Sequence, residues 1–113
     1  MPEKRYDKYT VEMSREAKRD LAEIIRYIAQ NNPRTALVIT DRIEAKINTL
    51  DHFPHRGAYV RELLDKNVKK YRHITEPPWK IIYQVDDKIV TIMAIIDSRR
   101  NLEDILVRKF LKF

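Results

Sequence analysis

Five side chains in the second half of the chain carry groups that can move protons or bind phosphate: Tyr71, His73, Lys80, Arg99 and Arg100. Cleavage of RNA by its own 2′-hydroxyl needs a base, an acid for the leaving oxygen, and cations for the charge of the transition state. A histidine with lysine and arginine neighbours supplies all three without a metal, provided that these side chains converge on one concave surface. The competing interpretation is an ordinary surface histidine, and the residues taken alone favour it.

Other catalytic and ligand-binding chemistries lack the residues that they need. The chain has no cysteine and a single glycine, which excludes a thiol nucleophile, a disulfide framework and a Gly-rich phosphate loop. His52, His55 and His73 have no acidic or histidine partner at ligand spacing on one helix face. We therefore expect neither a metal site nor a cofactor.

The formal net charge of +6 is carried by two segments. Residues 66–80 contribute +4 and residues 97–113 contribute +2, so the remainder of the chain is neutral overall. A concentrated positive charge indicates a polyanionic partner such as nucleic acid or an acidic protein tail. We predict a nucleic-acid-binding surface at Lys69, Lys70, Tyr71 and Arg72. The alternative for an excess of this size is a merely solubilising surface.

Periodicity predicts the elements that must position these residues. Residues 9–13 alternate as in a strand, Ser14 suits a helix N-cap, and apolar residues at helical spacing follow over residues 15–30. A second helix is expected from Pro33 to about residue 50, capped by Asn32. Because the connection between the two helices is short, they must form an antiparallel hairpin.

The second half of the chain is expected to form a β-meander. Strands are predicted over residues 59–63, 71–75, 79–85 and 89–96, and the last is apolar enough to be buried on both faces. Gly57 is expected in a turn at positive φ. An apolar stripe ending at Phe110 and Phe113 predicts a last helix that closes the core.

These elements predict a single α+β domain spanning residues 1–113. It has an N-terminal strand, an antiparallel helical hairpin, an antiparallel β-meander packed against the helices, and a short C-terminal helix, with the helices on one face of the sheet. The N-terminus carries no signal-peptide pattern, and the longest apolar run is too short to span a bilayer. We expect a cytoplasmic protein without membrane contact.

This organisation resembles the RelE/ParE superfamily of toxins from type II toxin–antitoxin systems, and within it the plasmid stabilisation group. The similar features are residues 17–28 of the first helix, Asn32-Pro33, Phe53-Pro54 with Gly57, the strand at residues 79–85, and Arg99-Arg100. The strand matches the family's aromatic-Arg-x-x-Tyr pattern, with Lys80 in place of the arginine. The resemblance spans about residues 9–106 and implies a toxin that arrests growth and is held inactive by a cognate antitoxin.

The resemblance leaves two targets open. The RelE branch enters the ribosome and cuts mRNA, and such a metal-independent endoribonuclease would use His73 for proton transfer with Lys80, Arg99 and Arg100 binding phosphate. The ParE branch inhibits DNA gyrase and is not a nuclease; its contacts would be the arginines and the C-terminal helix. Tyr71 and His73 replace two RelE lysines, and the RelE tyrosine near the C-terminus is absent. The first helix and the double arginine look more like ParE.

Two further expectations accompany this resemblance. The chain is a candidate for forming a homodimer. A non-toxic basic module that binds nucleic acid is the alternative function, and it requires only the cationic patch.

Overall fold

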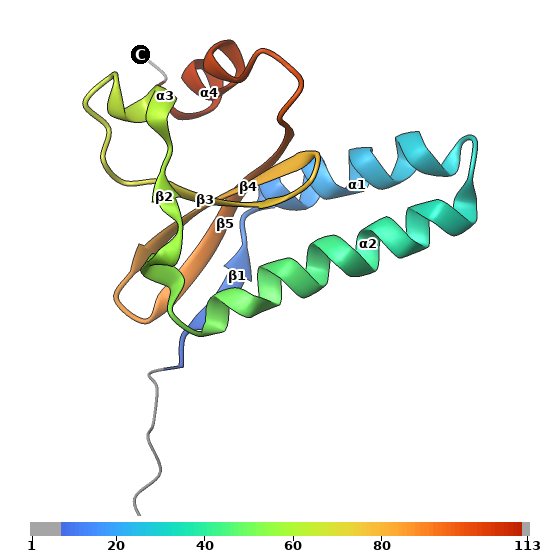
Figure 1. Cartoon of the computed structure of the whole chain (residues 1–113), viewed down its shortest axis with the longest axis horizontal. Coiled ribbons are helices and arrows are strands. Elements are labelled where there is room, and N and C mark those ends of the chain that lie inside the picture. Colours follow the sequence, from blue (N-terminus) through green and yellow to red (C-terminus); the bar gives the residue numbers. More distant parts are fainter. Residues whose placement is uncertain (1–7, 112–113) are drawn as a thin grey trace, which may run out of the picture.

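A computed structural model describes residues 8–111 of the chain (Figure 1). Its elements in order are β1 (Thr10–Met13), α1 (Arg15–Ala29), α2 (Pro33–Asn48), the 3₁₀ turns η1 (Thr49–Asp51) and η2 (Pro54–Arg56), β2 (Ala58–Tyr59), α3 (Arg61–Leu64), β3 (Arg72–Glu76), β4 (Trp79–Asp86), β5 (Ile89–Asp97) and α4 (Leu102–Phe110). Phe113, predicted at the end of the last apolar stripe, lies outside the described residues. No helix in the described range is long and apolar enough to cross a membrane.

The two long helices form the predicted antiparallel hairpin, which extends past the end of the sheet (Figure 1). Each helix begins at the expected cap: the Ser14 hydroxyl accepts the Ala17 N–H at 3.0 Å, and the Asn32 side chain accepts the Thr35 N–H at 3.0 Å. Pro33 occupies the first position of α2. Both helix boundaries therefore follow from local sequence signals.

The sheet is mixed, with strand order β1-β5-β4-β3-β2. Strand β1 runs parallel to β5, whereas the pairs β5–β4, β4–β3 and β3–β2 are antiparallel. A bulge interrupts the β4–β5 ladder between Ile82 and Tyr83. The predicted meander and the overall α+β class are confirmed, and β5 is buried on both faces as expected.

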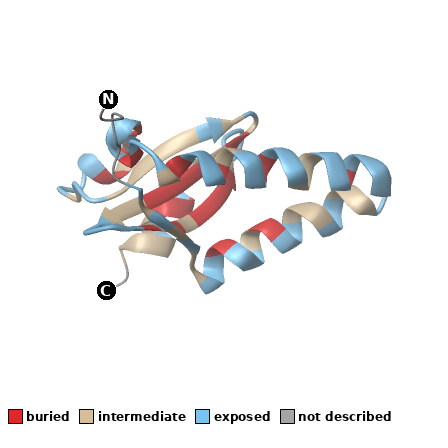
Figure 2. Cartoon of the chain, turned by 90° about the horizontal axis from the view of Figure 1, so that it is seen from below, coloured by how far each residue is buried: buried red, intermediate tan, exposed pale blue. Residues whose placement is uncertain are grey.

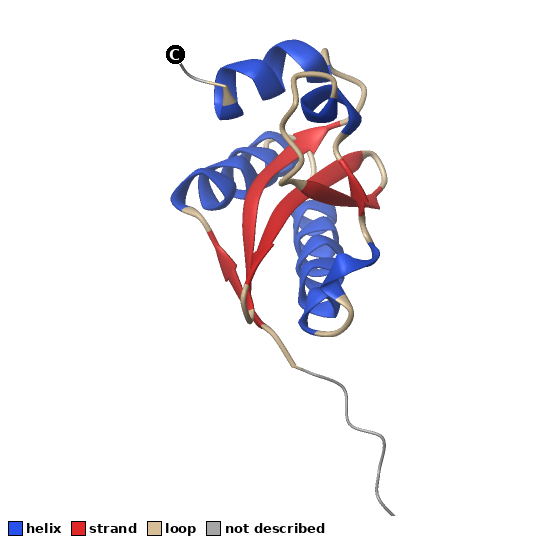
Figure 3. Ribbon diagram, turned by 90° about the vertical axis from the view of Figure 1, so that its left-hand side faces the viewer, coloured by secondary structure: helices blue, strands red, loops and turns tan. Residues whose placement is uncertain are grey.

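Helices cover both faces of the sheet, so the expectation that they lie on one face is wrong (Figure 3). One core cluster joins α1 and α2 to side chains such as Ile81 and Ile92, and the second joins α3 and α4 to Ile82, Ala94 and Ile96. Figure 2 shows the buried residues gathered on the central strands between the helices. The physical reason is that consecutive residues of β4 and β5 are apolar, so apolar side chains point to both faces of the sheet and both faces have to be shielded from water.

Two local predictions near Gly57 are wrong. The strand expected over residues 59–63 ends at Tyr59, and the short helix α3 (Arg61–Leu64) follows with Val60 as its N-cap. Val60 and Leu63 are three residues apart, which is a helical spacing, and both are buried. Gly57 has a φ of −71°, while Phe53 carries the positive φ, 48°. Glycine is required instead for space, since a Cβ at this position would collide with the Tyr83 hydroxyl and lie 2.6 Å from the His73 carbonyl oxygen.

Candidate functional site

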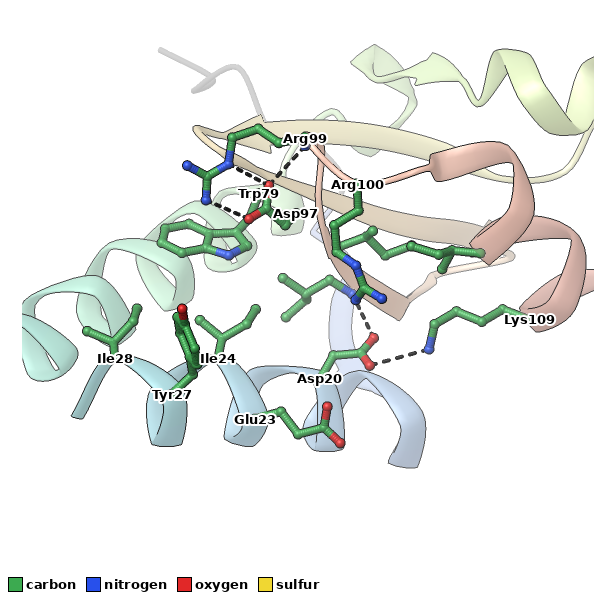
Figure 4. A pocket seen from close by; sticks show the side chains of 13 residues that line it. Asp20, Glu23, Ile24, Tyr27, Ile28, Trp79, Asp97, Arg99, Arg100 and Lys109 are labelled. Atoms are coloured by element: carbon green, nitrogen blue, oxygen red, sulfur yellow. Dashed lines mark hydrogen bonds and ion pairs between the residues drawn. The ribbon is translucent and has the colours of Figure 1, made fainter. Parts of the chain in front are cut away.

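A cavity of about 440 Å³ lies at the end of the sheet, between α1, the last residues of β5 and α4 (Figure 4). Helix α1 contributes Asp20, Glu23, Ile24, Tyr27 and Ile28; the sheet and its end contribute Trp79, Ile95, Ile96, Asp97, Arg99 and Arg100; and α4 contributes Ile105 and Lys109. The cavity thus combines an apolar floor with charges of both signs at its rim.

Arg99 is held by a carboxylate two residues earlier in the chain. Its Nε and Nη2 donate to the two carboxylate oxygens of Asp97 at 2.9 and 2.6 Å, and its backbone N–H also donates to that carboxylate at 2.9 Å. These hydrogen bonds to Arg99 lower the pKa of Asp97. The positive charge of Arg99 is therefore paired with the Asp97 carboxylate at the end of β5, where both residues line the cavity.

Asp20 joins three elements at the rim of the cavity. Its carboxylate accepts the Ile95 N–H at 3.0 Å and the Lys109 ammonium at 3.3 Å, and Arg100 points toward it (Figure 4). The pairing between β1 and β5 ends at Ile92, so β1 does not reach the backbone N–H of Ile95. The Asp20 carboxylate accepts this N–H in place of a strand carbonyl. Burial is the main cause that raises the pKa of Asp20.

Asp20 is not among the site residues predicted from the sequence, although the sequence carries a signal for it. Asp20 stands next to Leu21 on a helix whose buried residues are Ala17 and Leu21. A carboxylate beside the apolar face of a helix needs a polar partner when it is partly buried. The identity of that partner, a backbone N–H of β5, depends on the sheet register and was not available from the sequence.

His73 and Lys80 lie on the face of the sheet that packs against α3 and α4. His73 is paired with Ile82, and both Ile82 and Ile96, the partner of Lys80, belong to the core cluster shared with α3 and α4. Burial, followed by the charge of Lys80, lowers the pKa of His73. Within residues 8–111, the buried Nδ1 atom of His73 has no hydrogen-bond partner. Burial and the charge of Lys80 both favour the neutral form of this imidazole.

The five side chains predicted to move protons or bind phosphate form two groups in the structure. Arg99 and Arg100 form one, and Tyr71, His73 and Lys80 form the other. Arg99 and Arg100 line the cavity, which neither His73 nor Lys80 lines. Tyr71 packs on Phe110 of α4, with ring centroids 4.5 Å apart. No group of three or more side chains that could hold a metal ion occurs within the described range.

The residues predicted to bind nucleic acid lie along the edge formed by β2, β3 and the loop before β3. Lys69 and Lys70 are exposed, while Tyr71 and Arg72 are half-buried. Arg72 also has a structural role, because it donates to the carbonyl oxygens of His55 and Gly57 at 2.9 and 2.8 Å. These four residues remain a predicted contact surface for nucleic acid.

Comparison with known proteins agrees with this architecture. Residues 11–102 match the family described as the ParE toxin of the type II toxin–antitoxin system parDE. The chain is 30% identical to Toxin ParE3 of Caulobacter vibrioides over 91 residues, which are 80% of this chain and 87% of that protein.

Two solved structures share the fold at lower identity. The chromosomal ParDE system of P. aeruginosa aligns with a TM-score of 0.67 and 21% identity, covering 80% of this chain and 97% of that chain. The toxin–antitoxin complex RelBE2 of Mycobacterium tuberculosis aligns with a TM-score of 0.56 and 21% identity, covering 84% and 97%. With the family match over most of its length, the chain belongs to the ParE toxin family of type II toxin–antitoxin systems.

Proposed function

We propose that this toxin arrests growth by binding DNA gyrase rather than by cutting mRNA. The observation that carries the proposal is the separation of the charged groups. Metal-free RNA cleavage needs the proton-transfer group and the phosphate-binding cations around the same phosphate. Arg99 and Arg100 instead line a cavity together with the carboxylates of Asp20, Glu23 and Asp97, which repel an RNA phosphate.

Membership of the ParE family supports the same target, because the resemblance to the ParE branch implies gyrase inhibition rather than RNA cleavage. It also favours a toxin over a non-toxic basic module. The proposed gyrase contacts are Arg99, Arg100 and helix α4, which border one cavity. Its apolar lining residues Ile24, Tyr27 and Trp79 provide surface that a partner can bury, and its charged residues provide specificity.

Cleavage of mRNA is the second candidate, and one observation favours it. A neutral imidazole beside an ammonium group is suited to act as a base near a phosphate, and His73 beside Lys80 has that arrangement. In this case His73 transfers the proton and Lys80, Arg99 and Arg100 bind phosphate. The substitution His73→Ala then abolishes cleavage and toxicity, whereas a gyrase inhibitor retains its toxicity after the same change.

We also propose that a co-encoded antitoxin neutralises the toxin by covering the helical hairpin and the sheet. Tyr27, Leu37 and Val38 on the hairpin are 73%, 69% and 52% exposed, which is unusual for apolar side chains of this size. An extended or helical antitoxin segment can bury them. Light scattering of the purified toxin, with and without the antitoxin, will determine whether a homodimer forms as well.

Pulse labelling after brief induction in a bacterial host tests the target. Early loss of thymidine incorporation, with continued methionine incorporation, supports gyrase inhibition. Early loss of methionine incorporation contradicts it and supports cleavage on the ribosome. Coexpression of the antitoxin is the control, because it must restore both signals if the toxin causes the arrest.

A further inference from the structure

We propose that a basic ridge on the β2–β3 edge of the toxin binds the phosphate backbone of duplex DNA. The basic ridge consists of Arg56, Lys69, Lys70 and Arg72, with the rings of Tyr59 and Tyr71 between these cations. The inference rests on the proposed function in one respect: a gyrase inhibitor works where the enzyme holds DNA, so DNA is within its reach.

Tyrosine rings contact three of the four ridge cations, Lys69, Lys70 and Arg72, without neutralising them. The Arg72 guanidinium carbon lies 4.1 Å from the centroid of the Tyr59 ring, and the Lys69 ammonium lies 5.5 Å from the same centroid. The Lys70 ammonium lies 5.6 Å from the centroid of Tyr71. Cation–π contacts restrict the positions of these groups but leave their full positive charge available to a phosphate.

The two arginines are positioned by the backbone of the turn before β2. Arg72 donates to the carbonyl oxygens of His55 and Gly57 and to the Tyr59 hydroxyl, the last at 3.0 Å. Arg56 donates to the His52 carbonyl at 3.0 Å and to the Thr49 hydroxyl at 2.6 Å. Such fixed guanidinium groups lose little conformational freedom when they bind a further anion.

The charge of the ridge is not matched by carboxylates, unlike the charge around the cavity. In the described part of the chain, the ion pairs with lysine or arginine are Arg42–Glu76, Lys66–Glu103, Arg99–Asp97, Arg108–Asp104 and Lys109–Asp20, and none of them includes a ridge cation. The ridge thus differs from the basic segment near the C-terminus: Arg99, Arg108 and Lys109 in that segment are paired with carboxylates, whereas the ridge cations are not.

The arrangement fits the backbone of a duplex better than the bases of a single strand. Stacking with a base needs an open aromatic face. The Tyr59 ring is already covered by Lys69 and Arg72, and the Tyr71 ring by Lys70 and Phe110. Cations without open rings favour contact with phosphates, which gives affinity without sequence preference.

Fluorescence anisotropy with a labelled mixed-sequence DNA duplex, in the absence of gyrase, tests the proposal. With four phosphate contacts, the slope of log affinity against log salt is about −3.6, so raising the salt fourfold weakens binding by about 150-fold. The variant Lys69→Gln/Lys70→Gln should reduce the slope to about −1.8, which corresponds to about a 12-fold loss over the same range. The matched control Lys18→Gln/Arg34→Gln removes two exposed positive charges from α1 and α2 and should keep the original slope.

Three results would overturn the proposal. The first is equal weakening by the ridge variant and the control variant, which would mean that only the net charge matters. The second is tighter binding of the wild-type toxin to single-stranded RNA than to the duplex, and the third is no binding to the duplex at low salt. Each of these results leaves gyrase inhibition untouched, because that activity is measured in a separate supercoiling assay.

Discussion

The hydroxyl of Tyr83 fixes the turn that carries part of the basic ridge, and removing it should lower the stability of the whole domain. Tyr83 is fully buried; its hydroxyl donates to the Pro54 carbonyl at 2.6 Å and accepts the Gly57 N–H at 3.1 Å. The substitution Tyr83→Phe leaves one buried N–H and one buried C=O without a partner. At about 1–2 kcal/mol for each group, the free energy of unfolding should fall by about 2–4 kcal/mol.

Urea denaturation followed by circular dichroism measures this change, and a thermal melt should show a fall in Tm of about 10 °C. Tyr27→Phe is the matched control, because Tyr27 is 73% exposed and its loss of a hydroxyl should change the stability very little. A loss below about 0.5 kcal/mol in Tyr83→Phe would refute the argument that these two hydrogen bonds hold the turn.

A double-mutant cycle with Gly57→Ala sharpens the test. The new Cβ would collide with the Tyr83 hydroxyl, so removing that hydroxyl should relieve part of the clash. The double variant should therefore be less destabilised than the sum of the two single variants, by about 1 kcal/mol or more. Additive losses would show that the close approach of Gly57 to Tyr83 is not what requires glycine.

Three further substitutions test the charged groups. Burial raises the pKa of Asp20, so its carboxyl group binds a proton more tightly in the folded state than in the unfolded state. The wild type should therefore lose stability as the pH rises from the ordinary pKa of 3.8 through the raised pKa, and Asp20→Asn should not show this loss. Identical pH profiles of the two proteins in urea titrations would contradict this prediction. Burial and Lys80 lower the pKa of His73, so the wild type should lose stability as the pH falls below 6.5, and His73→Gln should lose less over the same range. Lys109→Met removes the ammonium partner of Asp20, with side chains 25% and 16% exposed, and should cost about 1–2 kcal/mol in a urea titration; an unchanged midpoint would argue against a stabilising contact.

Local signals in the sequence were sufficient for much of the fold. Ser14, Asn32 and Pro33 marked the helix starts, and the apolar run of β5 indicated burial on both faces. Local signals do not show the consequence of that burial, helices on both faces, because the layer in which α4 packs depends on tertiary contacts. Gly57 was assigned to a positive φ because local sequence does not show that the Tyr83 side chain, 26 residues away, occupies the space of its Cβ.

The candidate site was less predictable than the fold. The sequence indicated that Arg99 and Arg100 follow the last strand, and they do. It did not indicate that Asp97 would bind Arg99, or that Asp20 would link β5 to α4, because both contacts depend on how the sheet ends. Whether His73 lies near the arginines depends on which face of the sheet each strand residue occupies. That face follows from the strand register, which the sequence does not give.

An assay of purified gyrase tests the central claim most directly. Supercoiling of relaxed plasmid DNA is followed at rising toxin concentration for the wild type, His73→Ala and Arg99→Gln/Arg100→Gln, and thermal melts establish that each variant is folded. We predict inhibition by the wild type, unchanged inhibition by His73→Ala, and at least about tenfold weaker inhibition by the double arginine variant, which corresponds to about 1.4 kcal/mol of binding free energy. Unimpaired supercoiling with the wild-type toxin, combined with mRNA cleavage on ribosomes that His73→Ala abolishes, would contradict the account.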